Sequence, residues 1–230
     1  KLAIDQVAVT GDLTVELGAG AGDTLESIAL GGMPSFTDSA NVTVELASPD
    51  ALVNGGLDNG SLDIAGIDAL LNHGIDNITL DVAPGNIDSL FTAGELNSDL
   101  INAVSLAQQV GTNGHSLDVR LDVGGHGVAG DLSLTDAQAH QLITNGLEFA
   151  AQDNITLDAA GGTHLSNSLK QLEKLAIDQV AVTGDLTVEL GAGAGDTLES
   201  IALGGMPSFT DSANVTVELA SPDALVNGGL

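Results

Sequence analysis

The chain has 230 residues, of which 43% are hydrophobic, and it contains no cysteine, tryptophan or tyrosine. Its formal net charge of -28 repels nucleic acid and anionic lipid and attracts cations. The lack of cysteine excludes a disulfide framework, and no apolar run approaches the roughly 20 residues that span a bilayer. We therefore expect an aliphatic globular core, no nucleic-acid partner and no membrane insertion in this segment.

An internal repeat dominates the sequence. Residues 174–230 repeat residues 1–57 letter for letter, and we call these two stretches the second copy and the first copy. Self-similarity at a fixed period is typical of array architectures, in which neighbouring units bury each other's apolar faces. We therefore expect residues 1–173 to form one long repeat and residues 174–230 to begin the next. Since Lys1 corresponds to Lys174, which lies inside an expected helix, we also expect the chain to be a window of a longer array.

Five segments alternate apolar and polar residues in the same way, which predicts strands with one buried and one solvent-facing side. They recur about every 35 residues, so five degenerate units build each long repeat. Short extra strands are expected at residues 7–9 and 62–64, with Thr10–Asp12 as a hairpin turn between two strands. The five segments are residues 13–17, 42–46, 78–82, 119–123 and 155–159.

Helical periodicity appears between these strands. Residues 135–143 have Thr135 as an expected N-cap, and residues 67–73 end at Gly74. Further helices are expected at residues 23–30, 86–109 with a break near Gly94, and 165–175. The predicted fold is an α/β tandem-repeat array, in which a parallel or mixed sheet is extended unit by unit with helices on its apolar face. An all-β stack or β-solenoid is the alternative.

Acidic residues recur at one position of the five strands and predict a cation site. Side by side they would form a row of carboxylates about 4.8 Å apart, which repel one another unless a cation intervenes. Calcium, which takes oxygen ligands from several strands or loops, is the expected ion. A solvated acidic face with diffuse counterions stays open as the alternative. The row consists of Glu16, Glu45, Asp81, Asp122 and Asp158. Asp23 is a further candidate, because residues 18–25 resemble a calcium-binding glycine-rich nonapeptide in which alanine replaces two glycines, although a turn leading into the following helix is the favoured interpretation of this segment.

Other motifs argue against an enzyme. Gly125–Gly130 matches the dinucleotide glycine pattern, but the residues from Asp131 onward are expected to be extended rather than helical. The five histidines show no pair at zinc-ligand spacing, so surface or capping roles are expected for them. No nucleophile elbow occurs, because Asp118 stands where that motif needs glycine.

Residues 134–140, 154–158 and 163–169 resemble repeats of very large acidic bacterial extracellular proteins of the adhesin and biofilm-matrix kind. The resemblance lies in general character, since both are aliphatic, acidic, cysteine-free and tandemly repeated. It implies a secreted or cell-surface bacterial fibre, loaded with calcium or other divalent cations, whose repeats self-associate with neighbouring repeats or identical chains. An extracellular binding module for a glycan or for ice is the alternative function, since a ladder of threonines such as Thr14 and Thr43 could order water.

Overall fold

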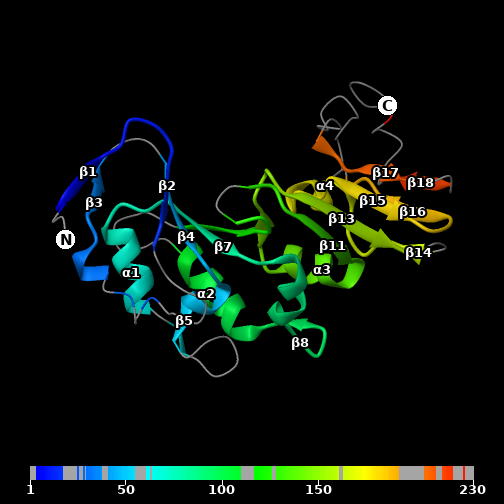
Figure 1. Ribbon diagram of the computed structural model, residues 1–230. Coiled ribbons are helices and arrows are strands. Elements are labelled where there is room, and N and C mark those ends of the chain that lie inside the picture. The colour runs from blue at the N-terminus through cyan, green and yellow to red at the C-terminus, as the bar shows by residue number, and fades with distance from the viewer. Residues whose placement is uncertain are drawn as a thin grey trace. The chain divides into compact units, whose positions relative to one another are not determined.

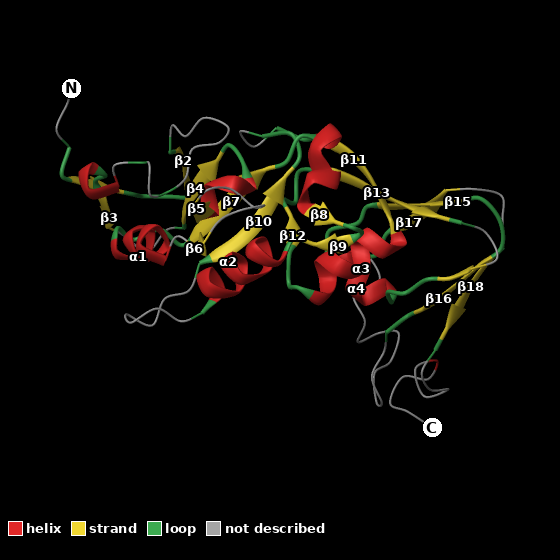
Figure 2. Cartoon of the chain, turned by 90° about the horizontal axis from the view of Figure 1, so that it is seen from below, coloured by secondary structure: helices red, strands yellow, loops and turns green. Residues whose placement is uncertain are grey.

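The computed structural model describes residues 4–17, 25, 28, 30–37, 41–54, 61–62, 64–109, 117–125, 128–160, 163–191, 205–210, 214–219 and 225. The chain forms two compact units, Lys1–Gly130 and Asp131–Leu230. Both units combine helices with parallel sheets, so the α/β class expected from the sequence is confirmed (Figures 1 and 2).

In the first unit the elements are β1 (Gln6–Ala8), β2 (Leu13–Glu16), η1 (Leu30–Gly32), β3 (Ser35–Thr37), β4 (Val42–Leu46), η2 (Pro49–Leu52), β5 (Val53–Asn54), β6 (Ser61–Leu62), α1 (Ile64–Asn72), β7 (Asn77–Asp81), η3 (Pro84–Leu90), β8 (Phe91–Thr92), β9 (Glu95–Leu96), α2 (Ser98–Gln108) and β10 (Asp118–Asp122). In the second unit they are β11 (Asp131–Thr135), α3 (Asp136–Thr144), β12 (Glu148–Phe149), β13 (Asn154–Ala159), β14 (Thr163–His164), α4 (Leu169–Lys174), β15 (Gln179–Val182), β16 (Leu186–Glu189), β17 (Ser208–Thr210) and β18 (Val215–Glu218).

Parallel strands that follow one another in the chain lie side by side in the first unit. β2 pairs with β4, β4 with β7 and β7 with β10, while β1 pairs with β3 in a second ladder. The expected hairpin at Thr10–Asp12 is therefore wrong, because β1 and β2 pair with later strands rather than with each other. The first two passages of the chain thus add one strand to each ladder, whereas β7 and β10 extend only the ladder of β2 and β4.

The second unit repeats this plan. β11, β13, β15 and β17 form one parallel ladder, and β14, β16 and β18 form the other. The pairs β13–β15 and β14–β16 join the end of the long repeat to the start of the second copy. The junction between copies therefore lies inside one continuously hydrogen-bonded unit.

Both copies use the same strand register. Gln6 lies opposite Ser35 and Leu13 opposite Val42, and their counterparts Gln179 and Leu186 lie opposite Ser208 and Val215. In each case a residue pairs with the one 29 positions later. Identical local sequence thus produces identical pairing in two surroundings, which indicates that the register is encoded within the copy.

The helices largely follow the capping signals in the sequence. Thr135 caps α3 and Ser168 caps α4, each in a reciprocal capping box with the glutamine three residues later. α1 ends where Gly74 adopts a φ of +81°, and a Cβ there would collide with the backbone carbonyl of Phe36. The helix expected from residue 23 to residue 30 falls mostly outside the described residues.

The helix expected over residues 86–109 is divided into three elements. Residues 84–90 form the 3-10 helix η3, β8 and β9 form a short antiparallel hairpin, and only Ser98–Gln108 is α-helical. Ala93 and Gly94 both have positive φ at the hairpin turn. The predicted break near Gly94 is confirmed, but it is a hairpin turn and not a kink.

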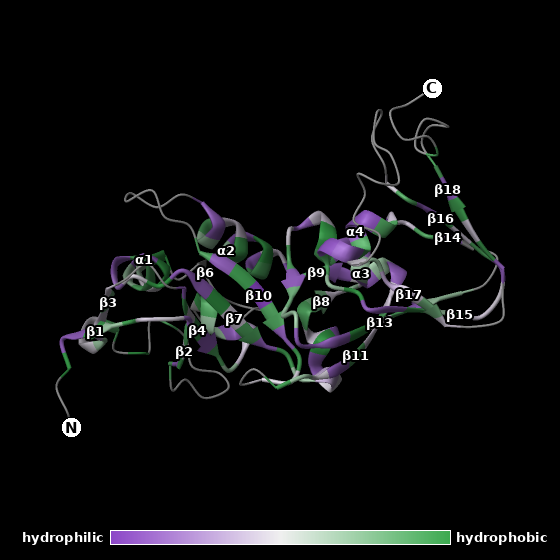
Figure 3. Ribbon diagram, turned by 90° about the horizontal axis from the view of Figure 1, so that it is seen from above, coloured by the Kyte–Doolittle hydropathy of each residue, from purple (hydrophilic) through white to green (hydrophobic). Residues whose placement is uncertain are grey.

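The core of each unit is aliphatic, with few aromatic residues. Alternating strand residues such as Val44, Ile78 and Leu80 are fully buried, and α2 contributes Leu100 and Val104. Figure 3 shows hydrophobic and hydrophilic residues alternating along these strands and around α2. Between helices α3 and α4 the ring Nδ1 of His140 lies 3.0 Å from the Oδ1 of buried Asn167, so this histidine has a structural role.

Candidate metal centre

The structure brings the predicted acids together in pairs and not in a single row. Glu16 lies directly opposite Glu45, and Asp81 directly opposite Asp122. Between β4 and β7, however, Glu45 lies opposite Thr79, which is an offset of two residues from the expected alignment. The prediction of one continuous row is therefore wrong at this strand pair, where the longer connection through α1 resets the register.

Two of these acids are buried, although the alternation predicted them to face solvent. Glu45 and Asp122 are each less than 5% exposed. The Asp122 carboxylate accepts a hydrogen bond of 2.8 Å from the backbone N–H of Gly125, where φ is +68°. Asp122 thus closes the turn that follows β10, a structural role that needs no cation.

The other two predicted acids lie elsewhere. Asp158 is exposed in the second unit, on β13, with Thr135 and Ala181 opposite it on the neighbouring strands. Asp23 lies outside the described residues. The calcium role of Glu16, Glu45, Asp81, Asp122, Asp158 and Asp23 stays a prediction.

A cavity of about 330 Å³ opens at the carboxyl ends of β4, β7 and β10. This edge of a parallel sheet is where ligands commonly bind. Most of the residues that line it are small, and its polar side chains are those of Ser48, Asp81, Asn86 and Ser89. Asp81 Oδ2 lies against Gly125, where an added Cβ would come within 3.2 Å of it. The cavity can hold a small polar molecule, but its residues form no recognisable catalytic set.

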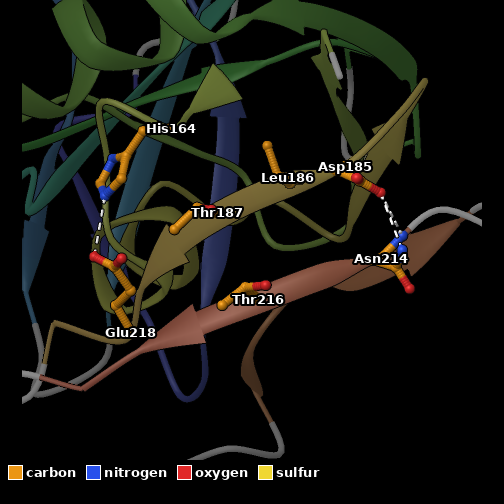
Figure 4. A pocket seen from close by; sticks show the side chains of 7 residues that line it. All are labelled: His164, Asp185, Leu186, Thr187, Asn214, Thr216 and Glu218. Carbon is orange, nitrogen blue, oxygen red and sulfur yellow. Dashed lines mark hydrogen bonds and ion pairs between the residues drawn. The ribbon is translucent and has the colours of Figure 1, made fainter. Parts of the chain in front are cut away.

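Among the described residues, a cluster of three exposed ligating groups lies where the end of the long repeat meets the second copy. His164 on β14, Glu189 at the end of β16 and Glu218 at the end of β18 place one ligand atom each within 4.8 Å of one another. We call these three residues the junction triad. His164 Nε2 lies 3.4 Å from Glu218 Oε2 (Figure 4). Glu189 and Glu218 are the second-copy counterparts of Glu16 and Glu45, so part of the predicted acidic row recurs here.

A cavity of about 350 Å³ lies beside the junction triad. Its polar lining runs along the start and the middle of β16 and β18, where Asp185 Oδ1 accepts a hydrogen bond from the Asn214 amide at 3.2 Å. Thr187 and Thr216 lie opposite each other between these groups (Figure 4). The cavity thus runs along polar side chains of β16 and β18, and His164 and Glu218 lie at one end of it.

The hydrogen bonds of His164 determine which ring nitrogen can act. Its Nδ1 lies 2.9 Å from the backbone carbonyl oxygen of Leu165, an acceptor, so Nδ1 carries the hydrogen. In the neutral ring Nε2 then presents a lone pair to Glu218, which favours a proton or a metal ion between them. The Leu165 carbonyl first, and Glu218 second, raise the pKa of His164 above its ordinary 6.5.

One imidazole nitrogen and two carboxylates suit a divalent transition metal such as Zn²⁺ better than calcium, which prefers oxygen ligands alone. The histidine also donates its second ring N–H to a carbonyl, as metal-ligating histidines usually do. Sequence spacing could not reveal this cluster, because its members lie 25 and 29 residues apart with no local motif. Only the strand register β14–β16–β18 brings them together.

The remaining motifs can be compared with the structure where their residues are described. The extended strand β11 begins at Asp131, so no helix opens after Gly125–Gly130 as a dinucleotide site requires. No helix among the described residues is long and apolar enough to cross a membrane. Comparison with protein families, curated proteins and solved structures finds no match.

Proposed function

We propose that this chain is a repeat segment of a secreted or surface-attached bacterial fibre, of the adhesin-stalk or biofilm-matrix kind, in which successive copies stack strand on strand. The observation that carries the proposal is the junction in the second unit. There β13 and β14, from the end of the long repeat, pair with β15 and β16 from the start of the second copy. An array built this way has no linker between successive long repeats. Its function is to form a long, stiff fibre.

Burial at the junction supports stacking. Ile177, just before β15, is 2% exposed, whereas its first-copy counterpart Ile4 is 47% exposed. At the other edge the relation is reversed: Val44 is fully buried beside β7, whereas its counterpart Val217 is 43% exposed. The same side chains are buried wherever a following or preceding strand lies beside them. Each buried aliphatic side chain contributes about 1.5–3 kcal/mol, so stability in an array should grow with the number of junctions.

The charge of the chain fits an extracellular fibre whose assembly depends on cations. Acidic pairs such as Glu16–Glu45 and Glu189–Glu218 lie directly opposite each other on neighbouring strands, where like charges destabilise the pairing. Divalent cations at these positions would relieve the repulsion. Calcium at the all-carboxylate pairs and a transition metal at the junction triad are the ions that the ligand sets favour.

Chains of one, two and three whole long repeats of 173 residues test the proposal. Their urea midpoints should rise with the number of long repeats, because each added repeat adds one junction. Electron micrographs of the longest chain should show a straight fibre with no beads. Equal midpoints together with globules joined by gaps would contradict stacking and indicate independent domains.

A further inference from the structure

We infer that one transition-metal ion at the junction triad links the end of one long repeat to the first two passages of the next. The inference rests on the proposed stacking of long repeats and names what strengthens each junction. His164 belongs to β14 at the end of the long repeat, whereas Glu189 and Glu218 belong to β16 and β18 of the second copy. The site is therefore complete only where two long repeats meet.

The junction triad spans three neighbouring strands. β14 and β18 flank β16 in one parallel sheet, so His164 and Glu218 reach toward each other across the middle strand. His164 Nε2 lies 3.4 Å from Glu218 Oε2 (Figure 4). Glu189, on the middle strand, lies directly opposite Glu218. An ion held by all three side chains would link both outer strands to the middle strand, in addition to the hydrogen bonds between adjacent strands.

The His164 ring is oriented for metal binding. Its Nδ1 hydrogen is directed at the Leu165 carbonyl at 2.9 Å, which leaves the Nε2 lone pair on the side of Glu218. The side chains of His164 and Glu218 are 48% and 55% exposed, so an ion can enter from solvent. Three protein ligands leave one position of tetrahedral Zn²⁺ for water, and the polar cavity beside the junction triad can hold that water.

The ion would also relieve a repulsion that is built into the junction. Glu189 and Glu218 lie directly opposite each other, and like charges in this arrangement destabilise strand pairing. Glu16 and Glu45 form the same pair in the first copy, but β14, which carries His164, pairs with the second copy. Since an imidazole nitrogen favours Zn²⁺ over calcium, a transition metal should act on the second-copy pair.

Hydrogen exchange measured by NMR on the full chain tests the inference, because it reports each backbone N–H separately. The N–H groups of Leu186 and Leu190 donate across β16–β18 to the carbonyls of Asn214 and Glu218, both at 2.9 Å. Zn²⁺ at about a hundred times its Kd should slow the exchange of these two N–H groups about a hundredfold, because the ion binds only while the strands are paired.

The first copy supplies an internal control with the same sequence. There the N–H groups of Leu13 and Leu17 donate to the carbonyls of Asn41 and Glu45, at 3.0 and 3.3 Å. Zn²⁺ should leave their exchange rates unchanged. Equal slowing in both copies would overturn the inference, since a pair of glutamates without the histidine would then be enough.

Variants of the ligands locate the ion. His164→Ala should abolish the slowing across β16–β18. Glu218→Gln, which keeps the size of the side chain, should weaken zinc binding about tenfold or more, and it serves as the test if loss of the imidazole loosens β14. Glu95→Gln removes a charge from an exposed position of the first unit and should change nothing. Slowing that survives both ligand variants, or calcium that protects as well as zinc, would overturn the inference.

A further amide separates this inference from the proposed function. The Leu165 N–H donates to the Thr187 carbonyl at 3.1 Å across β14–β16, which is the junction itself. It should exchange slowly without zinc, because stacking precedes metal binding. Slow exchange at Leu165 with no effect of zinc at Leu190 would overturn the metal link and leave stacking intact. Exchange at Leu165 as fast as in an unfolded peptide would instead refute the proposed function.

Discussion

Asp178 and Ile155 exchange two hydrogen bonds across the strand pair β13–β15. The backbone N–H of Ile155 donates to the Asp178 carboxylate at 2.8 Å, and the backbone N–H of Asp178 donates to the Ile155 carbonyl at 3.0 Å. Asp76 and Val42 make the same two bonds in the first unit, at 2.8 and 2.9 Å. An aspartate just before a strand thus clamps the start of the preceding strand and fixes the register of the pair.

The clamp predicts a stability difference between identical residues. Asp178→Ala should lower the free energy of unfolding by about 1.5–3 kcal/mol, the usual contribution of a hydrogen bond to a charged group. Asp178→Asn keeps an oxygen acceptor and should cost less. Asp5→Ala, the same change in the first copy, should be nearly neutral in urea unfolding, because no described strand lies where β13 would make the bond. Equal losses at both positions would contradict a register clamp.

A second prediction concerns the apolar side of the junction. Ile177→Ala should lower the free energy of unfolding by about 2–5 kcal/mol, since Ile177 is fully buried. Ile4→Ala should cost less than about 1 kcal/mol, because its side chain is largely solvated. Urea midpoints of the two variants give the comparison directly. The prediction fails if the two substitutions are equally costly, since the junction would then bury nothing that the free edge exposes.

Much of the fold could be predicted because its signals are local. All five alternating strands are confirmed within one residue at their starts, and Thr135 caps α3 as expected. The pairing could not be predicted, because it depends on how far each connection carries the chain. Asn77 begins β7, which lies in the ladder of β2, whereas the similar Asn154 begins β13, which pairs with β15, the second-copy counterpart of β1.

The strand-start asparagines illustrate the same limit. Asn41 lies just before β4, and Asn154 is the first residue of β13. Their partners could not be predicted: the amides of Asn41 and Asn154 donate to Asp12 and Asp131, aspartates on the neighbouring passage of the chain. The junction triad escaped prediction for the same reason, since strand register alone unites it.

The pKa of His164 gives a third prediction. Because its folded pKa is raised above 6.5, protonation stabilises the fold; this contribution is fully present below pH 6.5 and is lost as pH rises through the folded pKa. In a chelator-treated sample, NMR titration of the imidazole should report the raised pKa. Glu218→Gln should lower the pKa in part, since the Leu165 carbonyl remains, whereas Glu95→Gln, an exposed change in the other unit, should not. A pKa at or below 6.5 would contradict the geometry.

Zinc binding provides a fourth prediction. Zn²⁺ should bind the full chain with one strong site and raise its melting temperature, because a ligand selective for the folded state stabilises it by mass action. Glu189→Gln removes a proposed ligand and should weaken zinc binding by about tenfold or more. Glu16→Gln is the matched control. Glu16 is the first-copy counterpart of Glu189, but β14, which carries His164, pairs with the second copy. Titration calorimetry in which both variants bind alike would remove the junction triad as a metal site.

The fifth prediction separates specific calcium from general screening. A net charge of -28 destabilises the folded state, because the charges repel one another more strongly there than in the expanded chain. Acids such as Glu16 and Glu45 also lie opposite each other on neighbouring strands. Screening by sodium should raise the melting temperature somewhat, but millimolar calcium should raise it well beyond sodium at equal ionic strength, because only calcium can be coordinated by several carboxylates at once. Glu16→Gln should reduce the excess shift. Equal shifts in the two salts would leave these acids as a solvated face with diffuse counterions.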